Sequence, residues 1–210
     1  MIETKATGRQ ACFKPIPKLA RLILVEGLDD GLLVEEMCME EGLADQIQIL
    51  CFAQSGKMRD FLDLLVRDAN FGLVTHLGLT KDADNDPEAA RQSLTDAWAR
   101  AKRAIADIGR EEPRCSVFVV PDNHQSGRLE DLCLAAPTIP KLLKCAEDMY
   151  TCAGGAASHK IDREKSIVAA YLSMMERPGL QIGTGAQAGC WNLRSDVFGP
   201  LRDFVKSVGQ

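Results

Sequence analysis

Hydrophobic residues gather in four short runs along the chain, and longer segments of mixed polarity separate these runs. Each run is about one strand long and nearly continuous in apolar character, which is typical of a strand that is covered on both faces. Strands and helices therefore alternate in the first half of the chain. This order predicts an α/β fold whose parallel strands are joined by right-handed helical crossovers. The predicted strands cover residues 21–25, 47–52, 76–80 and 115–120.

The segments between and after these runs carry the three- and four-residue spacing of amphipathic helices. The first of them ends before Gly42 and the third begins after Pro87, and these residue types are common at those helix ends. Loops are predicted where small residues and glycines gather, at residues 151–158 and 181–190. The predicted helices cover residues 30–41, 57–69, 88–108, 129–135, 139–150, 162–175 and 196–208.

The composition of the chain is that of a globular domain. Of the 210 residues, 46% are hydrophobic and 26% are charged. We expect an α/β core over residues 19–136, and a mainly helical extension over residues 137–210 that packs on it within a single domain. No segment approaches the roughly 20 apolar residues that a membrane-spanning helix needs, and residues 1–18 lack the apolar stretch of a secretory signal.

The net charge and the cysteine spacing restrict which cellular compartment and which classes of partner we expect. The net charge is −5, which argues against a basic protein that coats nucleic acid. None of the 8 cysteines belongs to a C-x-x-C pair, so a zinc ribbon is not expected and the thiols are predicted to be free. Free thiols without an export signal indicate a reducing compartment. We therefore expect a cytoplasmic protein that does not associate with a membrane.

Acidic residues follow three of the four predicted strands. Glu26 and Asp30 follow the first strand, Asp82 and Asp84 follow the third, and Glu130 comes after the loop that follows the fourth. The carboxyl ends of parallel strands meet at one edge of a sheet, which is where such sheets bind ligands. Carboxylates gathered there need a counter-charge, and oxygen ligands favour Mg²⁺, Mn²⁺ or Ca²⁺ over zinc. The sequence therefore predicts a divalent metal site at this edge.

Helix capping is the alternative explanation for several of these carboxylates. Asp29 or Asp30 could cap the helix that follows the first strand, and Asp86 could cap the next long helix. Glu130 could be a solvated residue in the first turn of its helix, where the dipole favours negative charge. Capping explains Glu26 least well, because it directly follows a buried strand and precedes a glycine.

The first strand ends in Glu-Gly at residues 22–27, two aspartates follow at 29–30, and the third strand ends in D-x-D at 82–84. These features resemble the TOPRIM domain that topoisomerases, bacterial primases and overcoming-lysogenisation-defect nucleases share. Along the chain stand, in order, V-E-G-x-x-D at residues 25–30, G-K at 56–57, D-x-D at 82–84, P-x-N at 121–123 and G-x-L-E-D at 127–131. This series resembles still more closely an uncharacterised bacterial and archaeal family of TOPRIM-like proteins. That family also has a lysine-bearing helix, which residues 159–172 resemble, and a glycine–tryptophan segment like residues 189–191.

The resemblance implies a Rossmann-like core with a mostly parallel central sheet flanked by helices, and it implies roles for the acidic residues. Glu26 matches a glutamate that is a metal ligand in some members and a general acid or base in others. Asp82 and Asp84 match the metal-binding pair. Asp30 matches an aspartate that also binds metal in the nuclease branch.

The same resemblance implies a second metal site and a cationic residue. Ser126 and Glu130 are the nearest matches to the serine and glutamate that complete the second site in the nuclease branch. A lysine on a later helix stabilises charge in that branch, and both Lys160 and Lys165 are candidates for it.

These roles imply cleavage of nucleic-acid phosphodiester bonds with Mg²⁺ or Mn²⁺ as cofactor. Lys57 and His124 are further candidates for contact with the substrate. One alternative is a catalytically weak module that binds a metal-nucleotide or a nucleic-acid end and acts with a protein partner or as a homodimer. Another is a phosphatase, in which Asp82 would have to serve as the nucleophile. The chain lacks the G-x-x-x-x-G-K-[ST] motif of the ATPase domain that often accompanies the nuclease branch.

Overall fold

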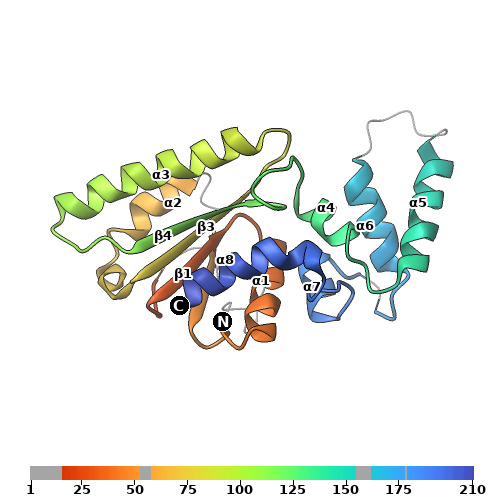
Figure 1. The fold of residues 1–210 in the computed structure, drawn as a ribbon, viewed down its shortest axis with the longest axis horizontal. Helices are drawn as coiled ribbons and strands as arrows, with labels where there is room; N and C mark the ends of the chain where they lie inside the picture. Colours follow the sequence, from red (N-terminus) through yellow and green to blue (C-terminus); the bar gives the residue numbers. More distant parts are fainter. Residues whose placement is uncertain (1–15, 53–57, 155–161, 178) are drawn as a thin grey trace.

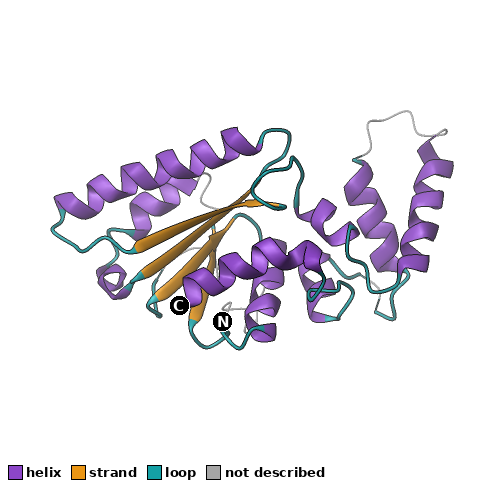
Figure 2. Ribbon diagram, in the orientation of Figure 1, coloured by secondary structure: helices purple, strands orange, loops and turns teal. Residues whose placement is uncertain are grey.

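The computed structural model contains one four-stranded sheet in which all neighbouring strands are parallel, in the order β2-β1-β3-β4 (Figure 1, Figure 2). The predicted α/β class, with a parallel sheet flanked by helices, is confirmed. The structure describes residues 16–52, 58–154, 162–177 and 179–210. The strands are β1 (Arg21–Val25), β2 (Ile47–Cys51), β3 (His76–Asp82) and β4 (Arg114–Val120).

Helices cover both faces of the sheet, which explains why the strands are apolar along almost their whole length (Figure 1). Side chains alternate between the faces. Ile23 and Val25 of β1 belong to the apolar cluster under α1 and α8, whereas Leu22 and Leu24 belong to the cluster under α2 and α3. The four covering helices are α1 (Leu28–Glu40), α2 (Met58–Leu65), α3 (Pro87–Asp107) and α8 (Gly199–Gly209).

The chain after β4 first moves away from the sheet and then returns to it. In Figure 1, α5 and α6 pack against each other beside the sheet, and α8 lies across the sheet face. Phe204 of α8 stacks on Phe118 of β4 with ring centroids 5.4 Å apart. The apolar core therefore crosses the boundary predicted at residue 136, and residues 19–136 alone would leave part of one sheet face uncovered. The remaining elements are η2 (Ala69–Leu73), α4 (Leu129–Leu134), α5 (Pro140–Gly154), α6 (Arg163–Ser173), α7 (Ile182–Gln187) and η3 (Asp196–Phe198).

Two segments predicted as loops contain helix instead. Helix α5 continues to Gly154, so the first four residues of the predicted loop 151–158 extend it, and the Thr151 hydroxyl donates a hydrogen bond to the carbonyl of Glu147 at 2.8 Å. The glycine-rich segment 181–190 contains α7. Local propensity disfavours helix in the glycine-rich segment, but the packing of α7 against α1 overrides it.

Gly183 lets α7 approach α1 closely. A Cβ atom on Gly183 would lie 2.6 Å from the Cβ of Leu32 and 2.9 Å from the carbonyl oxygen of Asp29. The Gly183 amide donates a hydrogen bond to the Asp29 carboxylate at 2.8 Å. Glycine at this position therefore serves a tertiary contact and does not mark a loop.

No helix in the described ranges is long and apolar enough to cross a membrane. Of the seven cysteines that the structure describes, four are buried.

We predict that Gly183→Ala lowers the free energy of unfolding by about 1–3 kcal/mol, the usual cost of overpacking. The added methyl group meets backbone atoms of α1, which cannot rotate away. Urea denaturation followed by circular dichroism would measure the change. Gly199→Ala is the matched control, because a Cβ atom there meets nothing within 4 Å. Equal stability of the two variants would contradict the close α1–α7 contact.

Candidate functional site

The carboxyl ends of β1 and β3 form the topological switch point of the sheet. From β1 the chain crosses through α1 to β2 on one side, and from β3 it crosses through α3 to β4 on the other side. The helices of these two crossovers lie on opposite sheet faces, so the strand ends between them lie at the position where open α/β sheets bind ligands. Glu26 directly follows β1, and Asp82 is the last residue of β3.

Asp82 is the carboxylate with the most unusual surroundings. Its Oδ1 atom is buried and has no hydrogen-bond partner among the described residues. Burial, together with the negative charges of Asp30, Glu130, Asp84 and Glu26, raises the pKa of Asp82 to about 8, and burial is the largest cause. These four carboxylates therefore lie close enough to act on Asp82, and we call the five residues the acidic cluster.

Asp30 is both a helix cap and a member of the acidic cluster. Its Oδ2 atom accepts a hydrogen bond from the Gly27 amide at 3.0 Å, at the start of α1. Burial raises the pKa of Asp30 to about 6, although backbone hydrogen bonds oppose the shift. Asp30 therefore both caps α1 and belongs to the acidic edge predicted from the sequence.

Glu130 links the acidic cluster to α6. Only 14% of its side chain is exposed, and the Lys165 ammonium lies 4.0 Å from its Oε1 atom. Arg128 holds the start of α6 in this position with two hydrogen bonds to Asp162, at 2.7 and 3.0 Å. Asp162 in turn accepts a hydrogen bond from the Lys165 amide at 3.1 Å, and its pKa is lowered to about 2, mainly by Arg128. The contact between α4 and α6 thus places Lys165 beside the acidic cluster.

Glu26 and Asp84 are the exposed members of the acidic cluster. Glu26 lines a groove of about 770 Å³ on the α2 and α3 side, together with Lys81, and we call this cavity the α2–α3 groove. Asp84 has a positive φ of 49°, and its backbone pairs with Gly127 through hydrogen bonds of 2.9 and 2.8 Å. This pairing joins the chain after β3 to the loop that follows β4.

Two other predicted residues line separate cavities. Ser126 lines a cavity of about 500 Å³ with Asp131 and Asp196, and exposed His124 lines one of about 650 Å³ between β4 and α8. No residue of the acidic cluster is among the described residues that line these two cavities. Lys57 and Lys160 lie outside the described residues.

Sequence reasoning missed Lys81 and Arg128. Lys81 precedes Asp82 in β3, so strand alternation alone places these two side chains on opposite faces of the sheet edge. Arg128 precedes the first residue of α4 and stands inside the motif at residues 127–131. Its partner Asp162 is 34 residues away, so no local pattern reveals the pair.

The donor chemistry of the acidic cluster fits Mg²⁺ or Mn²⁺, because every side-chain donor is a carboxylate oxygen and one of them has no partner. In the described ranges, no three His, Cys, Asp or Glu side chains converge closely enough to hold one ion as they stand. Mg²⁺ keeps several waters and is commonly held by one or two carboxylates together with substrate phosphates. The arrangement therefore fits this open kind of site and does not form a closed protein cage.

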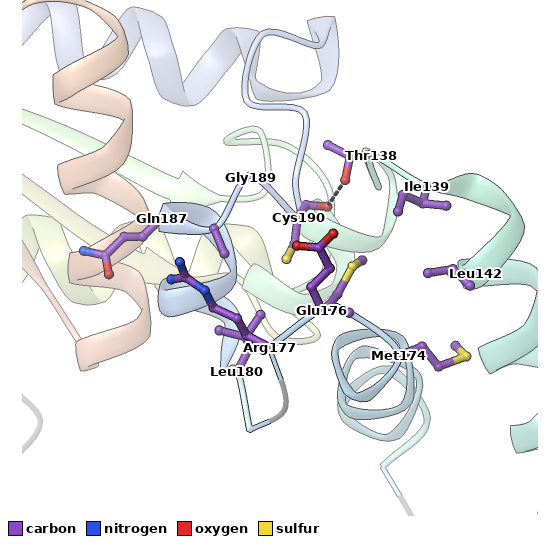
Figure 3. A pocket seen from close by; sticks show the side chains of 12 residues that line it. Thr138, Ile139, Leu142, Met174, Glu176, Arg177, Leu180, Gln187, Gly189 and Cys190 are labelled. Carbon is purple, nitrogen blue, oxygen red and sulfur yellow. Dashed lines mark hydrogen bonds between the residues drawn. The ribbon is translucent and has the colours of Figure 1, made fainter.

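A further cavity lies between α5, α6 and α7 (Figure 3). It measures about 470 Å³, and at one wall the Thr138 hydroxyl donates a hydrogen bond to the carbonyl of Cys190 at 3.0 Å. Its described lining includes Glu176 and Arg177 and several apolar side chains, but none of the predicted site residues.

Comparison with known proteins gives one family. Residues 20–210 match the family described as "Protein of unknown function (DUF3226)". The chain belongs to this family. No curated protein matches the chain, and no solved structure does either. The family match covers every residue of the acidic cluster and the α2–α3 groove, as well as α8.

We predict that, without divalent metal, the protein loses stability as the pH rises from about 4 to about 8. Asp82 ionises near pH 4 when unfolded but keeps its proton to about pH 8 when folded, so the folded state binds the extra proton in this interval. Asp30 acts in the same direction up to about pH 6. Asp82→Asn should therefore reduce the slope and be more stable than the wild type at about pH 8, by at least about 1.4 kcal/mol.

Thermal and urea denaturation in EDTA, at several pH values, would measure this difference. Asp148→Asn is the control, because Asp148 is an exposed residue on α5 that pairs with Lys144. A parallel pH dependence for the wild type and Asp82→Asn would contradict the burial of this carboxylate.

Proposed function

We propose that the chain is a TOPRIM-like enzyme that cleaves phosphodiester bonds of nucleic acid with Mg²⁺ or Mn²⁺. The observation that carries the proposal is the Asp82 carboxylate, which has a buried oxygen without a described partner among four other acidic side chains. A protein that leaves such a charge unbalanced loses stability unless a cation binds there. The position at the switch point of the sheet supports a ligand site at the same place.

Asp82 would hold the ion, and Asp84 or Glu130 would supply the second carboxylate. When bound, the metal lowers the pKa of a coordinated water and offsets charge on the phosphoryl group. The net reaction adds water across a P–O bond, so that hydroxyl joins phosphorus and a proton joins the leaving oxygen.

The remaining residues of the site have roles that follow from their positions. Glu26 is exposed at the strand edge, where a carboxylate can accept or return the proton of the attacking water. The Lys165 side chain is 61% exposed beside Glu130, so its ammonium can approach a phosphoryl group and offset the charge that develops there.

A nuclease assay with supercoiled plasmid, single-stranded DNA and single-stranded RNA, in Mg²⁺ or Mn²⁺, tests this function. We expect metal-dependent cleavage that falls by about 100-fold or more in Asp82→Asn and in Glu26→Gln, since each change removes a group that acts on the transition state. Asp148→Asn should cleave like the wild type, because its carboxylate lies on the exposed surface of α5. Cleavage that survives in Asp82→Asn would overturn the proposed site.

A second function is favoured by one observation. Ser126 and Glu130 are the nearest matches to the residues of the second metal site in the nuclease branch, but Ser126 is exposed and lines a cavity whose described lining does not include Glu130. A catalytically weak module that binds a metal-nucleotide or nucleic-acid end, with a protein partner or as a homodimer, needs only the first metal site. Calorimetric binding of Mn²⁺ that is lost in Asp82→Asn, without cleavage by the wild type, would select this module over the nuclease.

A further inference from the structure

The α2–α3 groove lies beside the acidic cluster but on the other face of the sheet edge. Its floor is apolar, since Phe52 and Met58 are 5% and 7% exposed. Polar side chains of α3 and the end of β3 stand around this floor, namely those of Lys81, Gln92 and Ser93. A concave site with an apolar floor and a few convergent polar groups is typical of a site for a small ligand or for one unit of a polymer.

Lys81 is the cation that faces this groove from the sheet. Its ammonium lies 3.5 Å from the Ser93 hydroxyl and makes no ion pair with any described residue. Other lysines of the described chain do have carboxylate partners: Lys102 pairs with Glu112 at 2.9 Å and Lys144 with Asp148 at 2.7 Å. An ammonium and a hydroxyl side by side are donors that suit a phosphate oxygen.

The acidic residues of the groove do not neutralise Lys81 directly. Glu26 and Asp96 both line the groove, but neither lies within the 4.0 Å of an ion pair with Lys81. Asp96 instead accepts a hydrogen bond from the Gln92 amide at 2.7 Å. The positive charge of Lys81 therefore remains available to an anion that enters the groove.

The shape and position of the groove restrict that anion. A cavity of about 770 Å³ is large enough for one nucleotide, whose base or sugar would lie on the apolar floor. A base inside a duplex is stacked and paired, and it enters a concave site only if it is first unpaired. Glu26 lies at the boundary between the groove and the acidic cluster, so a strand with one nucleotide in the groove continues toward Asp82.

We propose that the α2–α3 groove binds one unpaired nucleotide of a single strand, with its phosphate on Lys81 and Ser93, and so selects single-stranded substrate for the acidic cluster. This inference rests on the proposed function for its substrate, a nucleic acid. The groove is a binding site of its own, so it can be tested without cleavage.

Fluorescence anisotropy with a labelled single strand of about ten nucleotides, a length typical of such sites, measures the binding. The measurements use full-length protein with Asp82→Asn as background, which prevents cutting of the bound strand. We expect Lys81→Met to weaken binding about tenfold, which is the effect of one charged hydrogen bond. The slope of log K against log salt concentration should fall by about 0.7, the contribution of one single-strand phosphate contact.

Matched variants separate a binding role from a structural one. Lys81→Arg keeps the charge and should retain both the affinity and the salt slope. Ser93→Ala should weaken binding by a smaller factor, and Lys144→Met, on exposed α5, should change nothing. A duplex of the same sequence should bind at least about tenfold more weakly, because its bases are not free to enter the groove. Where Lys81→Met does not fold, the Ser93→Ala variant and the comparison with duplex decide the outcome.

The results distinguish this proposal from the proposed function. If strand binding depends on Lys81 but the wild type cleaves nothing, the result would support the nucleotide site in the groove and overturn the proposed nuclease function. If the wild type cleaves nucleic acid, and Lys81→Met and Lys144→Met bind the strand equally, the nucleotide site in the groove would be overturned. The proposed nuclease function would then be retained. Duplex binding as tight as single-strand binding would also overturn the proposed site for an unpaired nucleotide.

Discussion

The two-sided burial of β1 and β3 is the constraint on which the rest of this structure depends. Both strands lie inside the sheet and are apolar along nearly their whole length, so each face must be covered by helices. The crossover helices provide part of this cover. The chain must also return from α5 and α6 so that α8 can close the face at β1, β3 and β4, where Gly78 leaves room for the Phe204 ring.

The same constraint concentrates charge at one edge. Because the strands are buried, polar groups gather where they end, and parallel pairing places those ends together. Asp82 is the last residue of β3. Its backbone still pairs with β4, while its carboxylate is buried against other acidic groups. Caps and ion pairs fix the surrounding backbone, through Asp30 on α1 and through Arg128 between α4 and α6. These contacts surround a carboxyl group whose buried Oδ1 atom has no described partner.

Because side chains alternate along β3, the two faces of this sheet edge carry groups of opposite charge. Lys81 and Asp82 are neighbours in β3, yet one faces the α2–α3 groove and the other faces the acidic cluster. Anionic groups on one face suit a cation, and a cation on the other face suits an anion. Glu26 takes part in both environments, because it lines the groove and its charge acts on Asp82. A bound metal and a bound phosphate would in this way meet at one strand edge from opposite sides.

The sequence by itself determined the elements whose signals are local. The strands follow from short apolar runs, and most helices from their spacing, so their observed bounds differ from the predicted ones by a few residues. It also located the acidic residues at the strand ends, because parallel topology alone brings those ends together. Only the tertiary structure decided that 182–187 forms a helix, because Gly183 there packs against Leu32 of α1, which lies far away in the sequence. It also decided that Lys81 faces a groove and that Arg128 pairs with Asp162, since these relations join residues of different elements and leave no periodic trace along the chain.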